Sequence, residues 1–191
     1  MDYVPGTVWL KEDNRVPAAT RAQSGFDEFV AEELVPAIAR DCGAKSPEEL
    51  GMIVAGASIG AYNALAALCR HPSLFKEAIC MSGTYELSKF IDGDMDEAWY
   101  FASPLHFLPN LAEEHPQLVS LRKSHVLLVH GTGRWEDPEE TWAVADVLGS
   151  RGIPNHVEEW GPEWDHDWPL WRKFLPEKLR ERLCGEGDPP Q

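Results

Sequence analysis

The sequence predicts an α/β fold, a three-layer α/β/α sandwich around a mostly parallel sheet, in a single domain covering residues 1–184. Two observations predict it. Short strand-like runs alternate with helical patterns along most of the chain. Several of these runs are apolar throughout, as strands covered on both faces of a sheet are. The last residues, 185–191, are expected to form a disordered tail.

Five short segments have the composition of strands. The run at 52–56 is compact, apolar and bounded by glycines, and the run at 126–130 ends directly before Gly131. The first segment is weaker because Pro5 and Gly6 interrupt it. The predicted strands are residues 3–9, 52–56, 77–82, 126–130 and 155–160.

Helical patterns separate these strands. A helix is predicted to begin at Ser24, with apolar residues at helical spacing up to Ile38, and Pro36 is expected to kink it or end it locally. Residues 84–125 are expected to be irregular, with one or two short helices. The other predicted helices are residues 59–70, 139–149 and 167–183.

Composition and charge exclude several classes of function. The formal net charge is -15 and the pI is about 4.8, a field that repels phosphate backbones and anionic lipid surfaces. We therefore expect no nucleic-acid partner and no membrane partner, and no apolar stretch is long enough to span a bilayer. The four cysteines lack metal-site spacing, and no secretory signal begins the chain. We expect a cytoplasmic protein without a metal or other cofactor.

The strongest motif is the G-x-S-x-G stretch at residues 56–60, which lies between a predicted strand and a predicted helix. A serine at such a turn projects its hydroxyl from a strained backbone, which requires small neighbours. This context favours Ser58 as a nucleophile and the backbone N–H of Ile59 as an oxyanion donor. The simpler alternative is a glycine-rich turn whose serine only caps the helix.

His166 is the predicted base. It lies in the loop after the last predicted strand, and the carboxyl ends of parallel strands share one edge of the sheet. An imidazole on that edge can reach a serine hydroxyl there. Alternatively, His166 is a surface residue held between Asp165 and Asp167.

An acid that orients the imidazole should follow a strand between Ser58 and His166 in the chain. The loop after residues 126–130 offers Glu136 and Asp137. Either carboxylate can instead cap the helix that follows. At this stage the residues alone leave both acids open.

Several aromatic residues are candidates for a substrate pocket, because an insertion after the second buried strand can cover the active edge. Aromatic residues at this density also often belong to a core. His130 ends a strand near the predicted site and is a weaker candidate for substrate contact. The candidate substrate-binding residues are Trp99, Phe101 and Trp135.

With these residues in place, the chain resembles the esterase group of α/β-hydrolases that is related to esterase D and the mycolyltransferases. The resemblance runs from about Trp9 to about Leu183 and implies the α/β-hydrolase fold and ester hydrolysis without a cofactor. Mycolyltransferase-like members use a glutamate shortly after a G-x-G turn, so the resemblance favours Glu136 over Asp137. The stretches that carry it are residues 56–60, 103–104, 108–111, 152–154, 166–169 and 171–172.

The chain departs from this family before the nucleophile. The family places several strands ahead of the strand that carries the nucleophile, and a loop after the third supplies a second oxyanion N–H. Here only one strand, residues 3–9, is predicted ahead of the strand at 52–56. We expect a gene model that begins late, a shortened fold completed by a homodimer through an exposed edge strand, or a degenerate member, in that order.

The sequence therefore predicts a serine esterase that acts on a small-molecule ester through an acyl-enzyme. Two alternatives remain at this stage. One is an acyltransferase, in which an alcohol replaces water as the acceptor. The other is a weak or inactive hydrolase-fold module that works through binding or oligomerisation.

Overall fold

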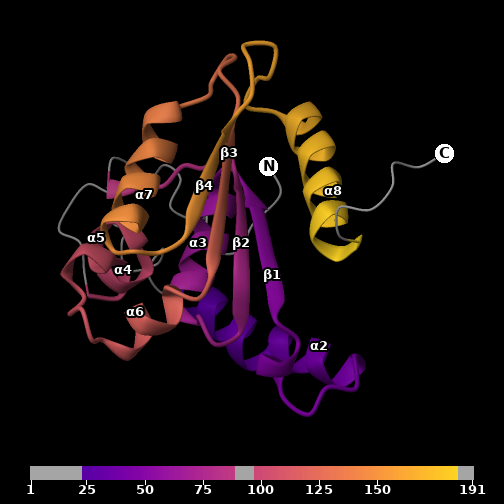
Figure 1. Cartoon of the computed structure of the whole chain (residues 1–191), viewed down its shortest axis with the longest axis vertical. Helices are drawn as coiled ribbons and strands as arrows, with labels where there is room; N and C mark the ends of the chain where they lie inside the picture. Colours follow the sequence, from indigo (N-terminus) through magenta and orange to yellow (C-terminus); the bar gives the residue numbers. More distant parts are fainter. Residues whose placement is uncertain (1–22, 89–96, 185–191) are drawn as a thin grey trace.

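The computed structural model describes residues 23–88 and 97–184, and these residues form an α/β fold around one parallel sheet. Its four strands lie in the order β1-β2-β3-β4, and each pairs in parallel with its neighbour (Figure 1). Their carboxyl ends therefore share one edge of the sheet. The strands are β1 (Met52–Ala57), β2 (Phe75–Met81), β3 (His125–His130) and β4 (Asn155–Glu159).

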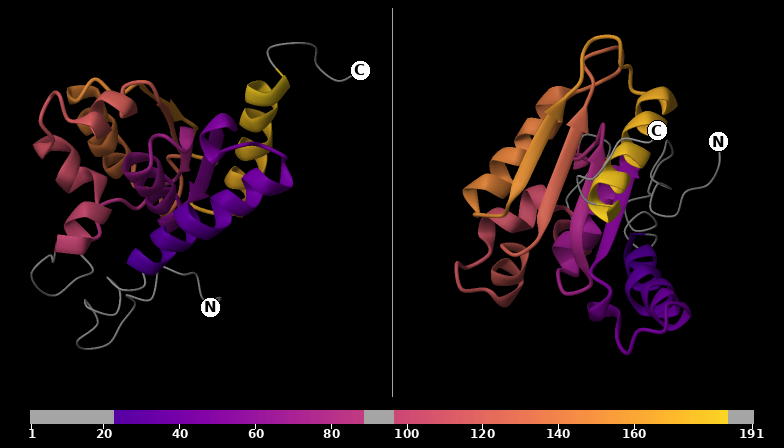
Figure 2. Two further views of the ribbon diagram at one scale, coloured as in Figure 1. Left: turned by 90° about the horizontal axis from the view of Figure 1, so that it is seen from below. Right: turned by 45° about the vertical axis from the view of Figure 1, so that its right-hand side comes forward.

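Helices cover both faces of this sheet, which confirms the predicted three layers. The larger core cluster joins the sheet to α3 and α7, and a smaller cluster around Phe174 joins the opposite face to α8 (Figure 2). The helices are η1 (Phe29–Leu34), α2 (Val35–Asp41), η2 (Pro47–Glu49), α3 (Ile59–Arg70), α4 (Glu97–Ala102), α5 (Pro104–Phe107), η4 (Leu108–Asn110), α6 (Pro116–Leu121), α7 (Pro138–Ser150) and α8 (Trp168–Cys184).

Four of the five predicted strands form within two residues of their expected bounds. β1 and β3 are largely apolar runs next to turn-forming residues, whereas the edge strand β4 is mostly polar. The fifth, residues 3–9, lies outside the described residues, as does the tail at 185–191. The irregular stretch contains α4, α5, η4 and α6, more helix than its composition predicted.

Pro36 does not end the helix as one of the predicted alternatives had it, and the turn before it is widened. The described part of this helical segment, from Gln23 onward, passes through the π-helical η1, where the N–H of Val35 donates to the carbonyl of Val30, five residues back. Pro36 follows at the second position of α2 and has no N–H to donate. The chain thus remains helical through the proline, with one wide turn before it.

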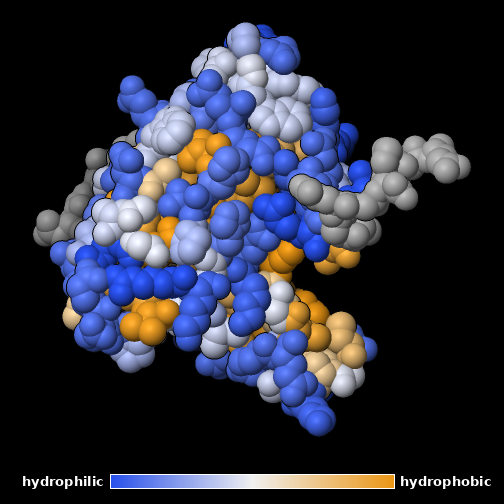
Figure 3. Space-filling view, viewed as in Figure 1, coloured by the Kyte–Doolittle hydropathy of each residue, from blue (hydrophilic) through white to orange (hydrophobic). Residues whose placement is uncertain are grey.

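β1 is an edge strand of the described sheet, and it is less covered than its neighbours. β2 and β3 are almost wholly buried, whereas most of β1 is half-buried and Ala55 is exposed. Apolar residues are visible where the surface is hollowed between α8 and α2 (Figure 3), and Leu34 and Ile38 are among the exposed large hydrophobic residues. The homodimer expected through this edge stays a prediction.

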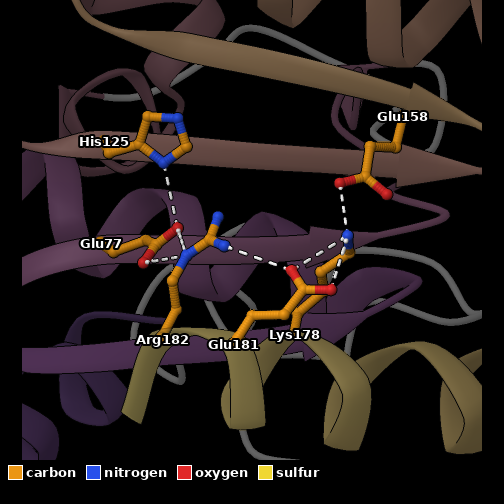
Figure 4. Close-up of polar contacts among 6 residues, drawn as sticks. All are labelled: Glu77, His125, Glu158, Lys178, Glu181 and Arg182. Carbon is orange, nitrogen blue, oxygen red and sulfur yellow. Dashed lines mark hydrogen bonds and ion pairs between the residues drawn. The ribbon is translucent and has the colours of Figure 1, made fainter. Parts of the chain in front are cut away.

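Ion pairs attach α8 to the sheet. The carboxylate of Glu77 on β2 accepts hydrogen bonds from His125 at 3.0 Å and from Nε of Arg182 at 3.1 Å (Figure 4). Burial alone would raise the pKa of Glu77, but these two donors bring that pKa below its ordinary value. One turn earlier in α8, Lys178 pairs with Glu158 at 2.8 Å. These contacts orient the helix that follows the loop of His166.

None of the helices in residues 23–88 and 97–184 is long and apolar enough to cross a membrane.

Candidate active site

Ser58 lies on a strained turn between β1 and α3. Its backbone has φ 56° and ψ -125°, and its N–H donates to the carbonyl of Met81 on β2 at 2.9 Å. The chain passes so close to itself here that a Cβ on Gly56 would stand 2.0 Å from the carbonyl oxygen of Gly60. Gly56 is therefore needed for the turn to close, whereas a Cβ on Gly60 would meet no atom within 4 Å.

His166 reaches this serine from the loop between β4 and α8. Its Nε2 lies 2.9 Å from the hydroxyl oxygen of Ser58, across 108 residues of chain. Its Nδ1 lies 3.9 Å from Oε2 of Glu136, within ion-pair range but longer than a hydrogen bond. Asp137, the other predicted acid, is exposed at the residue before α7. The structure thus brings Ser58, His166 and Glu136 together and leaves Asp137 aside.

The carboxylate of Glu136 is almost completely enclosed, with a side chain that is 1% exposed. Burial raises the pKa of Glu136 above its ordinary value, and a hydrogen bond from Ser82 and the nearby His166 partly oppose this shift. The hydroxyl of Ser82 donates to Oε1 of the carboxylate at 2.6 Å. The acid is therefore held by the side chain of the residue that follows β2 as well as by its own loop.

The loops that carry the acid and the base are bound to each other. The N–H of Gly133 donates to the carbonyl of Trp164 at 3.0 Å, and the N–H of His166 donates to the carbonyl of Arg134 at 3.0 Å. A Cβ on Gly131 would stand 2.1 Å from the Trp164 oxygen, so this approach also requires glycine. These contacts set the position of Glu136 relative to His166.

An exposed ion pair adds to this junction. The guanidinium of Arg134 binds the carboxylate of Asp165 with Nε at 2.9 Å and a terminal nitrogen at 2.7 Å, while the backbone N–H of Arg134 donates to the other oxygen at 2.7 Å. These donors lower the pKa of Asp165. Asp165 thus joins the two loops rather than holding the imidazole of His166.

The predicted oxyanion donor, Ile59, is the first residue of α3. The first backbone N–H groups of a helix have no partner one turn back and are directed out of its start. The Ile59 N–H is therefore adjacent to the Ser58 hydroxyl and free of the helix ladder. β1 is the first strand of the described sheet, so a second donor from the loop of an earlier strand is not among the described residues.

The three aromatic candidates have different surroundings. Trp99 is 2% exposed and packs on Tyr62 in the larger core cluster, with ring centroids 6.4 Å apart. This placement fits the core alternative rather than an open pocket wall. Phe101 is 46% exposed and meets the edge of Tyr100. Trp135 is 86% exposed at a positive φ of 68°, directly before Glu136.

Sequence reasoning missed Ser82 and the role of Trp171. Ser82 follows β2 at a positive φ of 47°, and it accepts a hydrogen bond from the indole N–H of Trp171 at 3.0 Å. The ring of Trp171 also packs edge-on against His166, with centroids 5.3 Å apart. A polar residue at the carboxyl end of a buried strand was the available signal for Ser82.

The arrangement has the geometry of nucleophilic catalysis. A hydroxyl faces an imidazole nitrogen, the other ring nitrogen faces a buried carboxylate, and a helix N-terminus lies next to the hydroxyl. No group of three or more His, Cys, Asp or Glu side chains with metal-binding geometry occurs in residues 23–88 and 97–184.

Comparisons with known proteins give a family and a fold. The model of the Esterase family, described as "Putative esterase", matches residues 9–181. A search of curated protein sequences finds no significant match.

Solved structures with a similar fold are esterases and hydrolases. A ferulic acid esterase superposes with a TM-score of 0.62 at 18% identity, over 81% of this chain and 59% of that one. S-formylglutathione hydrolases from Agrobacterium tumefaciens and Staphylococcus aureus give TM-scores of 0.61 and 0.60 at 17% and 18% identity. These two alignments cover 84% and 85% of this chain but 57% and 63% of the hydrolases. The chain thus spans about three-fifths of these neighbours, and at this identity they show the fold.

Proposed function

Because the chain belongs to the Esterase family, we propose that it is a serine hydrolase that cleaves carboxylic esters through an acyl-enzyme. The observation that carries the proposal is the 2.9 Å distance between the Ser58 hydroxyl oxygen and Nε2 of His166. That distance allows direct proton transfer from the nucleophile to its base.

In the proposed mechanism, Oγ of Ser58 attacks the ester carbonyl while Nε2 of His166 accepts the hydroxyl proton. The carbonyl oxygen becomes an oxyanion, which the Ile59 N–H stabilises. When the tetrahedral intermediate collapses, the ester C–O bond breaks and His166 gives its proton to the departing alcohol. Glu136 stabilises the imidazolium throughout these steps.

The acyl-enzyme then reacts with water. His166 accepts a proton from the water as its oxygen attacks the acyl carbon, and the Ile59 N–H again faces the oxyanion. Collapse breaks the bond between Ser58 and the acyl group, releases the acid and returns the proton to Ser58. The whole reaction consumes one ester and one water and releases one alcohol and one acid. The proposed partner is a small-molecule ester.

A fluorophosphonate probe tests the proposal, because its phosphorus forms a stable bond only with an activated serine. We expect rapid labelling of the wild type, with the modified peptide containing Ser58, and no labelling of Ser58→Ala. The matched control is Ser103→Ala, which removes another part-buried serine hydroxyl bonded to a histidine ring, that of His106 at 2.7 Å. It should label like the wild type.

Labelling should be followed by hydrolysis of p-nitrophenyl acetate, with release of p-nitrophenol measured by absorbance. A burst equal to the enzyme concentration would support the acyl-enzyme. A folded wild type that neither labels nor hydrolyses any of a panel of aryl and alkyl esters would refute the proposal. It would favour a hydrolase-fold module that works by binding.

A further inference from the structure

Ser82 joins the acid to a tryptophan on α8. It follows β2, where its N–H donates to the carbonyl of Val129 at 2.7 Å, and it is 2% exposed. Its hydroxyl lies 2.6 Å from Oε1 of Glu136 and 3.0 Å from the indole nitrogen of Trp171. Three chain segments, the end of β2, the loop after β3 and the start of α8, therefore meet at one oxygen atom.

The hydrogens available on each group determine which atoms donate and which accept in this network. An indole nitrogen can only donate, so Trp171 gives its hydrogen to the Ser82 oxygen. A serine hydroxyl has one hydrogen, and the remaining partner of Ser82 is the carboxylate, which can only accept when ionised. The Ser82 hydrogen must therefore point at Glu136. The 2.6 Å separation is typical of a hydroxyl bonded to a carboxylate.

Because of this bond, the two carboxylate oxygens of Glu136 have different partners. Oε1 is occupied by Ser82, which leaves Oε2 facing Nδ1 of His166 at 3.9 Å. The side chain of Glu136 is 1% exposed, so bulk water does not replace a lost donor. A hydrogen bond to the ionised form in a buried place stabilises that form.

Trp171 also contacts the base. Its ring stands nearly perpendicular to the imidazole of His166, with an interplanar angle of 85° and centroids 5.3 Å apart. The same side chain therefore limits the tilt of the base and, through its N–H, directs the hydroxyl that holds the acid. Trp171 lies in the first turn of α8, and the ion pairs of Glu77 and Lys178 hold that helix on the sheet.

We propose that Ser82 and Trp171 are positioning residues for ester hydrolysis, acting through a relay in which Trp171 directs the Ser82 hydroxyl and that hydroxyl orients and keeps ionised the carboxylate of Glu136. This inference rests on the proposed function. Neither residue touches the reacting atoms, so the relay should act on kcat and on the pH dependence, with little effect on KM.

The test compares Ser82→Gly, Trp171→Phe and the double variant in ester hydrolysis across pH. Glycine removes the hydroxyl and tolerates the positive φ of 47° at this position. Phenylalanine keeps a ring beside His166 and removes only the N–H. Ser82→Ala is the second hydroxyl deletion should the glycine variant fold poorly, and thermal unfolding checks the fold of each.

We expect Ser82→Gly to lower kcat by about tenfold to a hundredfold at neutral pH with KM unchanged, the usual range for losing a hydrogen bond to a charged group. Trp171→Phe should lower kcat less. The double variant should be no slower than Ser82→Gly, because the indole N–H acts only through the serine. The control is Trp160→Phe, which removes the indole of a tryptophan that packs on Phe174 of α8, the helix that also carries Trp171. This variant should leave kcat unchanged.

The acidic limb of kcat/KM distinguishes positioning from a structural role. Without the Ser82 hydrogen bond, the carboxylate of Glu136 is harder to ionise, so the limb should move to higher pH. The titratable groups facing Glu136 are His166 and His130, and Nε2 of His130 lies 3.9 Å from Glu159. All of these remain in the variants, so a shift would follow from the lost hydroxyl.

Three results would overturn the relay. The first is a folded Ser82→Gly with the kcat and the acidic limb of the wild type, and the second is a loss of kcat in the double variant equal to the product of the two single losses. The third is a shift of the acidic limb in Trp160→Phe equal to that in Ser82→Gly. Labelling of the wild type by the fluorophosphonate probe distinguishes a failure of the relay from a failure of the proposed function. If the wild type labels and the serine variant behaves like it, the relay fails alone. If the wild type does not label, the proposed function fails and the relay with it.

Discussion

Replacing Glu136 by glutamine removes the charge that faces His166 and keeps the size of the side chain. The carboxylate oxygen lies 3.9 Å from Nδ1 of His166. At an effective dielectric constant of about 20, a pair of unit charges at this separation attracts by about 4 kcal/mol. In the proposed mechanism the imidazole gains its charge in the transition state, so most of this attraction would act on the barrier. We therefore expect kcat to fall by about a thousandfold.

The assay is steady-state hydrolysis of an aryl ester by Glu136→Gln and by Asp137→Asn. KM should change little in Glu136→Gln, because the carboxylate does not contact the substrate. Asp137→Asn is the matched control: it removes a charge from the adjacent, exposed residue before α7, and kcat should stay within about threefold of the wild type, the scale of a surface charge change.

Thermal unfolding provides an independent check on Glu136. Burial raises the pKa of this carboxyl in the folded protein, so the ionised form costs stability once the pH exceeds that folded pKa. Glutamine removes the cost, and at neutral pH the variant should unfold at a temperature no lower than the wild type. A folded Glu136→Gln that keeps more than a tenth of the wild-type kcat would refute the role assigned to Glu136, and so would an equal loss in Asp137→Asn.

Two further substitutions test the scaffold of the site. Gly131→Ala should lower both the unfolding temperature and kcat, because the added Cβ would stand 2.1 Å from the carbonyl oxygen of Trp164 and push the two loops apart; a wild-type melting curve would contradict this. Glu77→Gln should lower the free energy of unfolding in denaturant by about 1–3 kcal/mol at pH 7, because a buried charge that accepts hydrogen bonds from His125 and Arg182 is lost. Glu181→Gln, at a side chain 40% exposed, should lower it far less. The pKa of Glu77 is lowered in the fold, so the stabilisation from its carboxylate is present above the ordinary value of 4.5 and is lost as the pH falls through the folded pKa. If below pH 4.5 the unfolding free energies of the wild type and of Glu77→Gln changed in parallel with pH, this prediction would be contradicted.

The parts of the molecule that depend on local composition could be predicted from the sequence. The strand before Ser58 is apolar throughout, and Gly56 permits the close approach of the tight turn into a helix. Because strand–helix alternation gives a parallel sheet, the ends of distant strands necessarily share an edge. This is why Ser58 and His166 could be paired across 108 residues of chain.

The tertiary structure alone decided how the acid is held. Glu136 and Asp137 are neighbours in the sequence with the same charge, and the direction of the loop after β3 turns one toward His166 and leaves the other exposed before α7. Ser82 and Trp171 carry no motif that links them to Glu136, and their meeting depends on the packing of α8 against the sheet. Residue types and spacing therefore determined which chemistry is available to the chain. The packing of separate segments determined which carboxylate lies beside the imidazole of His166, because contacts between side chains depend on distances that local sequence does not encode.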